Sequence, residues 1–97
     1  MKMDVKIKEN SWVGRLAARK LGAKNVAIVF GHTIHLFNVS KEEFLCHPKW
    51  VKHELCHVKQ FEKHGFYTFL FKYLWESIVR GYRNNKYEIE ARQAEDD

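Results

Sequence analysis

The sequence is poor in residues that break regular structure or cross-link a chain. It has one proline, five glycines and two cysteines among 97 residues. This content excludes a collagen-like chain, a flexible linker and a disulfide framework, and we expect Cys46 and Cys56 to be free thiols. No apolar run reaches the roughly 20 residues that a membrane-spanning helix needs. The charged N-terminus also lacks the apolar core of a signal peptide, so we expect a cytoplasmic location.

Apolar and charged residues are both plentiful. Hydrophobic residues make up 45% of the chain and aromatic residues 14%, which favours one globular domain over residues 1–97 and argues against disorder. The 17 basic and 12 acidic residues leave a net charge of +5 that is interspersed along the sequence. This length excludes a large multi-domain enzyme.

Hydrophobic periodicity and turn residues divide the chain into five main segments. They are an N-terminal helical segment (1–24), a β-hairpin (25–38) and three helices (48–64, 66–80 and 85–95). This order predicts an α+β fold: a small, mainly helical domain whose β-hairpin packs on the helix at 48–64.

Capping residues define several helix ends. Ser11 is placed to cap the first helix and Gly22 to end it, while Ser40 opens a capping box that predicts a short helical turn. Pro48 suits the first turn of the following helix. Gly65 is expected to end that helix in the left-handed conformation.

A metal-binding pattern lies within the helix predicted at 48–64. Residues 53–57 read HELCH, which fits the pattern H-E-x-x-H. His53 and His57 are four residues apart, so both imidazoles project from one helix face and can reach a single zinc ion. Glu54 points about 100° round the helix, where it can approach a water molecule without binding the metal.

Glu54 falls in the middle of the apolar face of its predicted helix. Burying an unpaired carboxylate costs free energy, and the positive charge of a nearby zinc ion would offset that cost. The alternative is an ion pair with Arg80 or Arg83, with the two histidines of the pattern partly exposed.

Candidates for a third zinc ligand lie near the C-terminus. The metzincin pattern is absent, because Gln60 and Lys63 occupy the positions of its glycine and third histidine. Glu88 and Glu90 lie about 200° apart on a helix, so only one can face the metal. Glu88 shares its face with the small Ala91, which allows close helix packing, and we choose Glu88.

These motifs resemble a known type of domain. The chain is similar to small bacterial zinc-metallopeptidase domains of the gluzincin type, most of them catalogued as domains of unknown function. The residues that carry this resemblance are HELCHVKQ at 53–60, Gly65, Tyr73, YRNN at 82–85 and EIEAR at 88–92. The Glu-x-Glu-Ala element also resembles the third-ligand segment of the CAAX prenyl protease and HtpX-like peptidases. Their first glutamate binds zinc, which implies the same for Glu88; they continue with Asp, where this chain has Arg92.

The resemblance implies a minimal zincin-like core and a zinc metallopeptidase acting on a peptide or protein substrate. His53, His57 and Glu88 would hold one Zn²⁺ per chain, and Glu54 would act as general base on a water acidified by the metal. Peptidases of this type lay their substrate along an edge strand, here part of the hairpin. Four side chains are candidate transition-state stabilisers, and the sequence does not choose among them: His32, His35, Tyr82 and Tyr87.

Two other functions stay open. One is a catalytically inactive zincin-like interaction module, which would keep the same ligands and base. The other is a structural zinc module that binds nucleic acid, suggested by the Cys-His pairs at 46–47 and 56–57. The absence of a C-x-x-C pair and the modest charge weigh against nucleic acid as a partner.

The helix at 66–80 is unusually aromatic. Its apolar residues cover more than half of its circumference, which indicates either a helix packed on two sides in an aromatic core or a face for a membrane surface or a protein partner. Gly81 is expected to break this helix.

Overall fold

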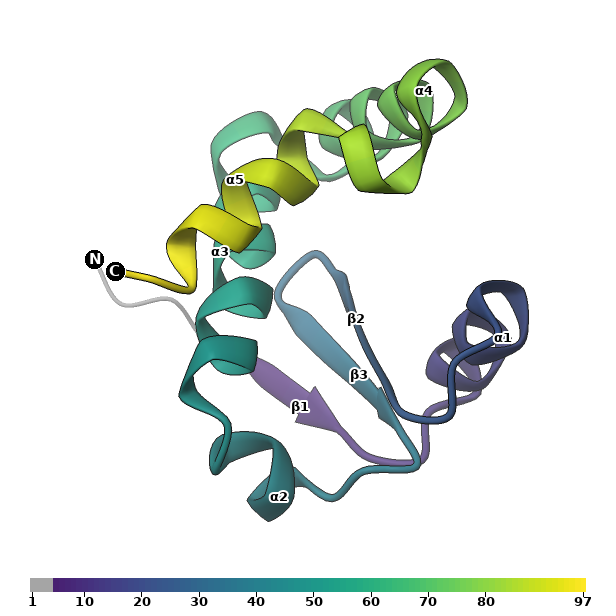
Figure 1. Ribbon diagram of the computed structural model, residues 1–97, viewed down its shortest axis with the longest axis vertical. Helices are drawn as coiled ribbons and strands as arrows, with labels where there is room; N and C mark the ends of the chain where they lie inside the picture. The colour runs from purple at the N-terminus through teal and green to yellow at the C-terminus, as the bar shows by residue number, and fades with distance from the viewer. Residues whose placement is uncertain (1–4) are drawn as a thin grey trace.

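Three strands and five helices form the part of the chain that the structure, a computed structural model, describes: residues 5–97 (Figure 1). In chain order they are β1 (Lys6–Lys8), α1 (Trp12–Leu21), β2 (Val26–Phe30), β3 (Thr33–Phe37), α2 (Lys41–Leu45), α3 (Pro48–His64), α4 (Phe66–Asn84) and α5 (Lys86–Ala94). The predicted α+β class is confirmed at this level: mostly helix, with one small mixed sheet.

The sheet has the strand order β1-β3-β2. β2 and β3 form the predicted antiparallel hairpin, in which Val29 lies opposite Ile34. β1 pairs with β3 in parallel through Ile7 and Ile34, and this strand was not predicted. The N-terminal segment therefore contains a strand before its helix, and its residues 1–4 lie outside the described part of the chain.

The caps explain where most helices begin and end. The Ser11 hydroxyl accepts a hydrogen bond from the first turn of α1, and Gly22 ends that helix in the left-handed conformation. Ser40 caps α2 in the same way. Gly65 corrects one prediction, because its φ of 85° and ψ of 155° are not left-handed helical: the chain turns there directly from α3 into α4. Gly81 breaks the helical geometry of α4, as predicted.

The core lies between one face of the sheet and α3, with α4 and α5 closing it. Ile34 and Leu36 on β3 are almost completely buried, as are Val58 on α3 and Phe69 on α4. Ala91 on α5 is fully buried, and its small side chain lets α5 pack closely on α3. This packing brings one face of α3 towards both β2 and α5.

α4 is buried along one face only. Phe69 is in the core and Tyr73 packs against it, whereas Tyr67, Phe71 and Ile78 are exposed. The helix is therefore not packed on two sides by the rest of the described chain. Within residues 5–97, no helix combines the length and the hydropathy that crossing a membrane requires.

Candidate metal centre

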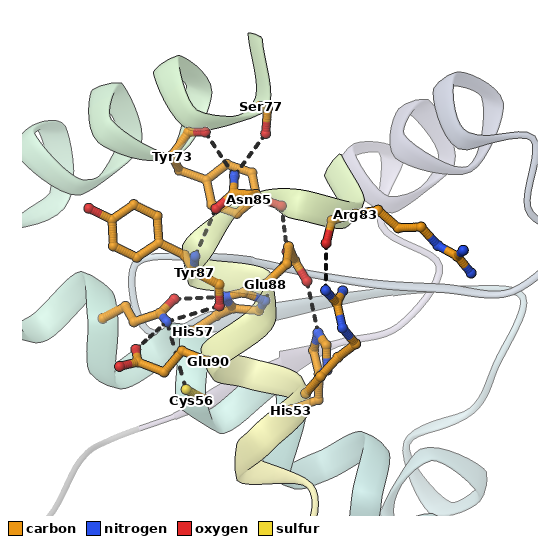
Figure 2. A network of polar contacts seen from close by, with 12 residues as sticks. His53, Cys56, His57, Tyr73, Ser77, Arg83, Asn85, Tyr87, Glu88 and Glu90 are labelled. Atoms are coloured by element: carbon orange, nitrogen blue, oxygen red, sulfur yellow. Dashed lines mark hydrogen bonds and ion pairs between the residues drawn. The ribbon is translucent and has the colours of Figure 1, made fainter. Parts of the chain in front are cut away.

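Three side chains from two helices converge on one point. His53 and His57 project from α3 and Glu88 from α5, and each offers a ligand atom within 4.8 Å of the other two. The Nε2 atom of His53 lies 3.0 Å from Glu88 Oε1, and that of His57 lies 3.1 Å from Glu88 Oε2. Figure 2 shows Glu88 reaching towards α3 from the first turn of α5. The predicted ligand set is thus brought together in space.

Asn85 fixes the start of α5 and hence the position of Glu88. Its Oδ1 accepts a hydrogen bond from a backbone N–H in the first turn of α5, at 2.8 Å. Its Nδ2 donates to the Tyr73 carbonyl (3.0 Å) and to Ser77 Oγ (2.9 Å), both on α4 (Figure 2). Because Asn85 is fully buried, all of these bonds form away from water.

Glu90 points elsewhere and accepts a hydrogen bond from Gln60 Nε2 at 2.6 Å. Gln60 is a buried residue that sequence analysis did not assign to the site. Its Oε1 accepts from His57 Nδ1 at 2.8 Å, and its Nε2 also donates to the Tyr87 carbonyl at 3.1 Å. The amide therefore orients the His57 ring, and Glu88 is the glutamate that faces the histidines.

Two further contacts hold the other ligands, and neither was predicted. His53 Nδ1 donates to Glu95 Oε2 at 2.7 Å, and the Tyr73 hydroxyl donates to Glu88 Oε2 at 2.5 Å. Metal-binding histidines commonly donate their second ring N–H to a carboxylate or carbonyl in this way. The signal for Glu95 and Tyr73 lies in the packing of α3, α4 and α5, which local sequence does not encode.

The charged groups of the centre stabilise one another in their ionised forms. Burial lowers the pKa of His53, but hydrogen bonds to Glu88 and Glu95 outweigh burial and raise it to about 9. The pKa of His57 is also raised, since the hydrogen bond and charge of Glu88 overcome burial. Burial opposes ionisation of Glu88, yet the two imidazoles hold its pKa well below the usual range. A divalent cation would take the place of the Nε2 protons between these groups.

Glu54 is buried on α3 beside the two histidines. Burial raises its pKa to about 7, while the positive charges of His57 and His53 act in the opposite direction. The proposed arginine pair is not observed: Arg80 pairs with Glu76 at 3.4 Å, and no ion pair joins Glu54 to an arginine in the described chain.

A cavity opens in front of these residues. It has a volume of about 170 Å³ and is lined by His53, Glu54, His57 and Glu88 together with β2 and α4. A second hollow, of about 790 Å³, shares His53, Glu54 and Tyr82 with the first. The two hollows adjoin beside β2, where His53 and Glu54 line both of them, and together they are called the cleft below.

Of the four candidate stabilisers, Tyr82 lines this cleft. The other three lie elsewhere. His32 is in the hairpin turn, with Nε2 3.7 Å from Glu62, and His35 Nδ1 is hydrogen-bonded to Ser11 Oγ at 2.7 Å. Tyr87 is buried, and its ring packs in the core.

β2 presents its edge to the cleft. All five of its residues line the cavity, although alternate side chains of a strand point to opposite faces. The Lys6 N–H donates to the His32 carbonyl. The backbone N–H and C=O groups of Ile34 and Leu36, two and four residues further on, therefore point to the β1 side of β3, and those of the residues between them point towards β2. The antiparallel register then turns the N–H and C=O groups of Ala27 and Val29 away from β3, towards the cleft.

Neither cysteine joins the cluster. Cys46 is exposed, and Cys56 has its Sγ 3.8 Å from Gln60 Nε2 on another side of α3. Burial raises the pKa of Cys56 to about 11, which keeps the thiol protonated at neutral pH.

Comparison of the chain with protein-family models, curated proteins and solved structures found no match. The chemistry of the centre therefore rests on its own donor atoms. Two imidazole nitrogens and one carboxylate oxygen form a set that suits zinc.

Proposed function

We propose that this chain is a zinc-dependent metallopeptidase with a minimal zincin-like core. His53, His57 and Glu88 would hold one Zn²⁺, and Glu54 would be the general base. The observation that carries this proposal is the convergence of three ligand atoms within 4.8 Å at a cleft that also contains a buried glutamate.

The surrounding hydrogen bonds support the assignment of Nε2 as the binding atom on both histidines. The Nδ1 of His53 donates to Glu95 and that of His57 donates to Gln60, so both rings are held with Nε2 towards Glu88. Such contacts fix the ring orientation and raise the basicity of the binding nitrogen. Tyr73 holds the carboxylate of Glu88 in the same manner.

A bound zinc ion would supply Lewis-acid chemistry, polarising a carbonyl oxygen and acidifying water. Glu54 would accept a proton at a carboxylate oxygen and deliver it to the nitrogen of the leaving amine. Tyr82 lines the same cleft, and burial raises the pKa of its hydroxyl, which therefore stays protonated and able to donate to a developing oxyanion.

The edge of β2 gives the cleft a way to hold an extended peptide. The outward N–H and C=O groups of Ala27 and Val29 can pair with the backbone of an added strand. Backbone pairing of this kind selects an extended conformation more than particular side chains. A peptide or an unfolded protein segment is therefore the substrate class that fits.

The test compares Glu54→Gln with Glu42→Gln, a matched variant at an exposed glutamate of α2, away from the cluster. Both proteins, purified without chelating resin, should carry one zinc per chain. Hydrolysis of unfolded casein should fall by about 10²–10⁴-fold in Glu54→Gln, the usual contribution of a general base. It should be unchanged in Glu42→Gln. Equal hydrolysis by the two variants would contradict the role of Glu54.

Two outcomes point to the other functions. Full zinc loading with no hydrolysis by the wild-type chain of any member of a peptide library would favour an inactive interaction module. Retention of zinc after His53→Ala would favour a structural zinc site elsewhere. The position of Cys46 and Cys56 outside the cluster gives a cysteine-based module no support.

A further inference from the structure

The exposed large apolar side chains are concentrated on two helices. Of thirteen such residues among 5–97, eleven belong to α1 or α4. On α4, Tyr67, Phe71, Leu74 and Ile78 follow each other at spacings of three or four residues, opposite the buried Phe69. Ile78 is 78% exposed and Tyr67 73%. This spacing produces one continuous apolar stripe along the outer face of the helix.

α1 has a shorter stripe of the same kind. Trp12 and Leu16 are four residues apart and exposed, while Gly14 and Ala18 are buried against the sheet. The outer face of α1 is thus apolar at its centre. Basic side chains flank that centre at positions 15, 19 and 20.

The positive charge of the chain lies on the same two segments. Residues 12–25 contain four basic residues and no acidic one, and residues 66–84 contain three basic and one acidic. The segments therefore carry +4 and +2, whereas the whole chain carries +5. The remaining 64 residues together carry −1. The basic residues concerned are Arg15, Arg19, Lys20, Lys24, Lys72, Arg80 and Arg83.

The two helices lie on the side of the molecule away from the end of α5 (Figure 1). Both helices also reach the same cavity, because Leu21 from α1 and Leu74 from α4 line it. The apolar stripes and the positive charge thus belong to the two helices that border the cavity.

We propose that α1 and α4 dock this chain on the surface of an anionic lipid bilayer. Exposed Trp, Tyr and Phe side chains favour the membrane interface, and flanking Lys and Arg side chains interact with anionic headgroups. A second copy of the chain fits this surface poorly, since two faces of the same positive charge would repel each other. The docking does not depend on the proposed peptidase activity.

The test is sedimentation of the full chain with two kinds of vesicle. One is an equal mixture of phosphatidylglycerol and phosphatidylcholine, and the other is phosphatidylcholine alone. The chain should bind the anionic vesicles, with a blue shift of its tryptophan fluorescence, and should bind the neutral ones much more weakly. Added salt should weaken the binding.

Two double variants separate the contributions, each with a matched control. Arg15→Glu with Arg19→Glu should weaken binding to anionic vesicles by at least about 25-fold, about fivefold for each lost cation. Trp75→Ser with Ile78→Ser should weaken it by about tenfold or more. The controls are the double variants Lys41→Glu with Lys59→Glu and Leu45→Ser with Ile89→Ser, at exposed residues outside the two helices, and they should bind much more like the wild type. Circular dichroism checks that each variant is folded.

Three results would overturn the docking. The first is no sedimentation of the folded wild-type chain with anionic vesicles. The second is equal loss of binding in the variants and their controls. The third is self-association of the chain that the Trp75 and Ile78 changes abolish while vesicle binding persists, since that would assign the stripe to a second copy.

Discussion

Gln60 gives the most informative single substitution, Gln60→Leu. Its side-chain amide serves three groups at once: it accepts from His57 Nδ1 at 2.8 Å, and it donates to the Tyr87 carbonyl at 3.1 Å and to Glu90 at 2.6 Å. Every fully buried side-chain nitrogen or oxygen in residues 5–97 has a hydrogen-bond partner. Leucine has a similar size but no polar atom. Gln60→Leu would therefore leave His57 Nδ1 without a hydrogen-bond acceptor and remove one of the bonds to the Tyr87 carbonyl.

Two magnitudes follow. Leaving a buried polar group unpaired costs about 1–3 kcal/mol, and only His57 Nδ1 is left so, because the Tyr87 carbonyl keeps its backbone bond within α5; the free energy of unfolding should therefore fall by about 1–3 kcal/mol. Loss of the contact that orients His57 should weaken zinc binding by about 10–100-fold. Urea denaturation of the metal-free protein measures the first quantity, and competition with a chromophoric chelator measures the second.

Two further variants make the result interpretable. Gln93→Leu changes the other glutamine, which is exposed, and should alter neither quantity. Gln60→Glu restores an acceptor for His57 but repels Glu90, so zinc affinity should recover more than stability does. A folded Gln60→Leu protein that binds zinc as tightly as the wild type would refute the idea that Gln60 orients a ligand.

Three other predictions concern the same centre and the first helix. Tyr73→Phe removes the hydroxyl that donates to Glu88, and zinc affinity should fall by about tenfold in chelator competition while the fold is kept. The pKa of His53 is about 9 in the fold against 6.5 in the unfolded chain, so its protonation stabilises the metal-free protein below pH 6.5. That contribution, about 3 kcal/mol, should be lost as the pH rises to about 9, and a flat profile of urea stability would contradict it. Ser11→Ala removes the cap of α1 and the hydrogen bond to His35, which should lower the free energy of unfolding by about 1–2 kcal/mol.

Elements with a strong local pattern were predictable. Pro48 and the glycine after His64 mark both ends of α3, and the hairpin follows from two β-branched and aromatic runs around a short turn. β1 has three residues with one apolar side chain, and its partner β3 is 27 residues further along the chain. Such a parallel pairing leaves no local signal, because it depends on tertiary contacts alone.

The residues of the metal centre also fall into those that local sequence predicts and those that it does not. His53, Glu54 and His57 follow from helical spacing, and the choice of Glu88 over Glu90 follows from the phase of α5 and the small Ala91 beside it. Their supporting residues do not follow from spacing. Gln60, Tyr73 and Glu95 meet the ligands only because three helices pack together, and each has an ordinary surface or core role in its own helix.

X-ray absorption at the zinc edge is the most direct test of the proposed centre. The wild-type chain loaded with one zinc should show the scattering of two imidazole rings, with Zn–N distances of about 2.0–2.1 Å, and of light oxygen ligands. Glu88→Ala should alter the oxygen contribution and weaken binding, whereas Glu90→Ala should leave the spectrum unchanged. Sulfur scattering at about 2.3 Å, or a spectrum without imidazole, would contradict a site formed by His53, His57 and Glu88.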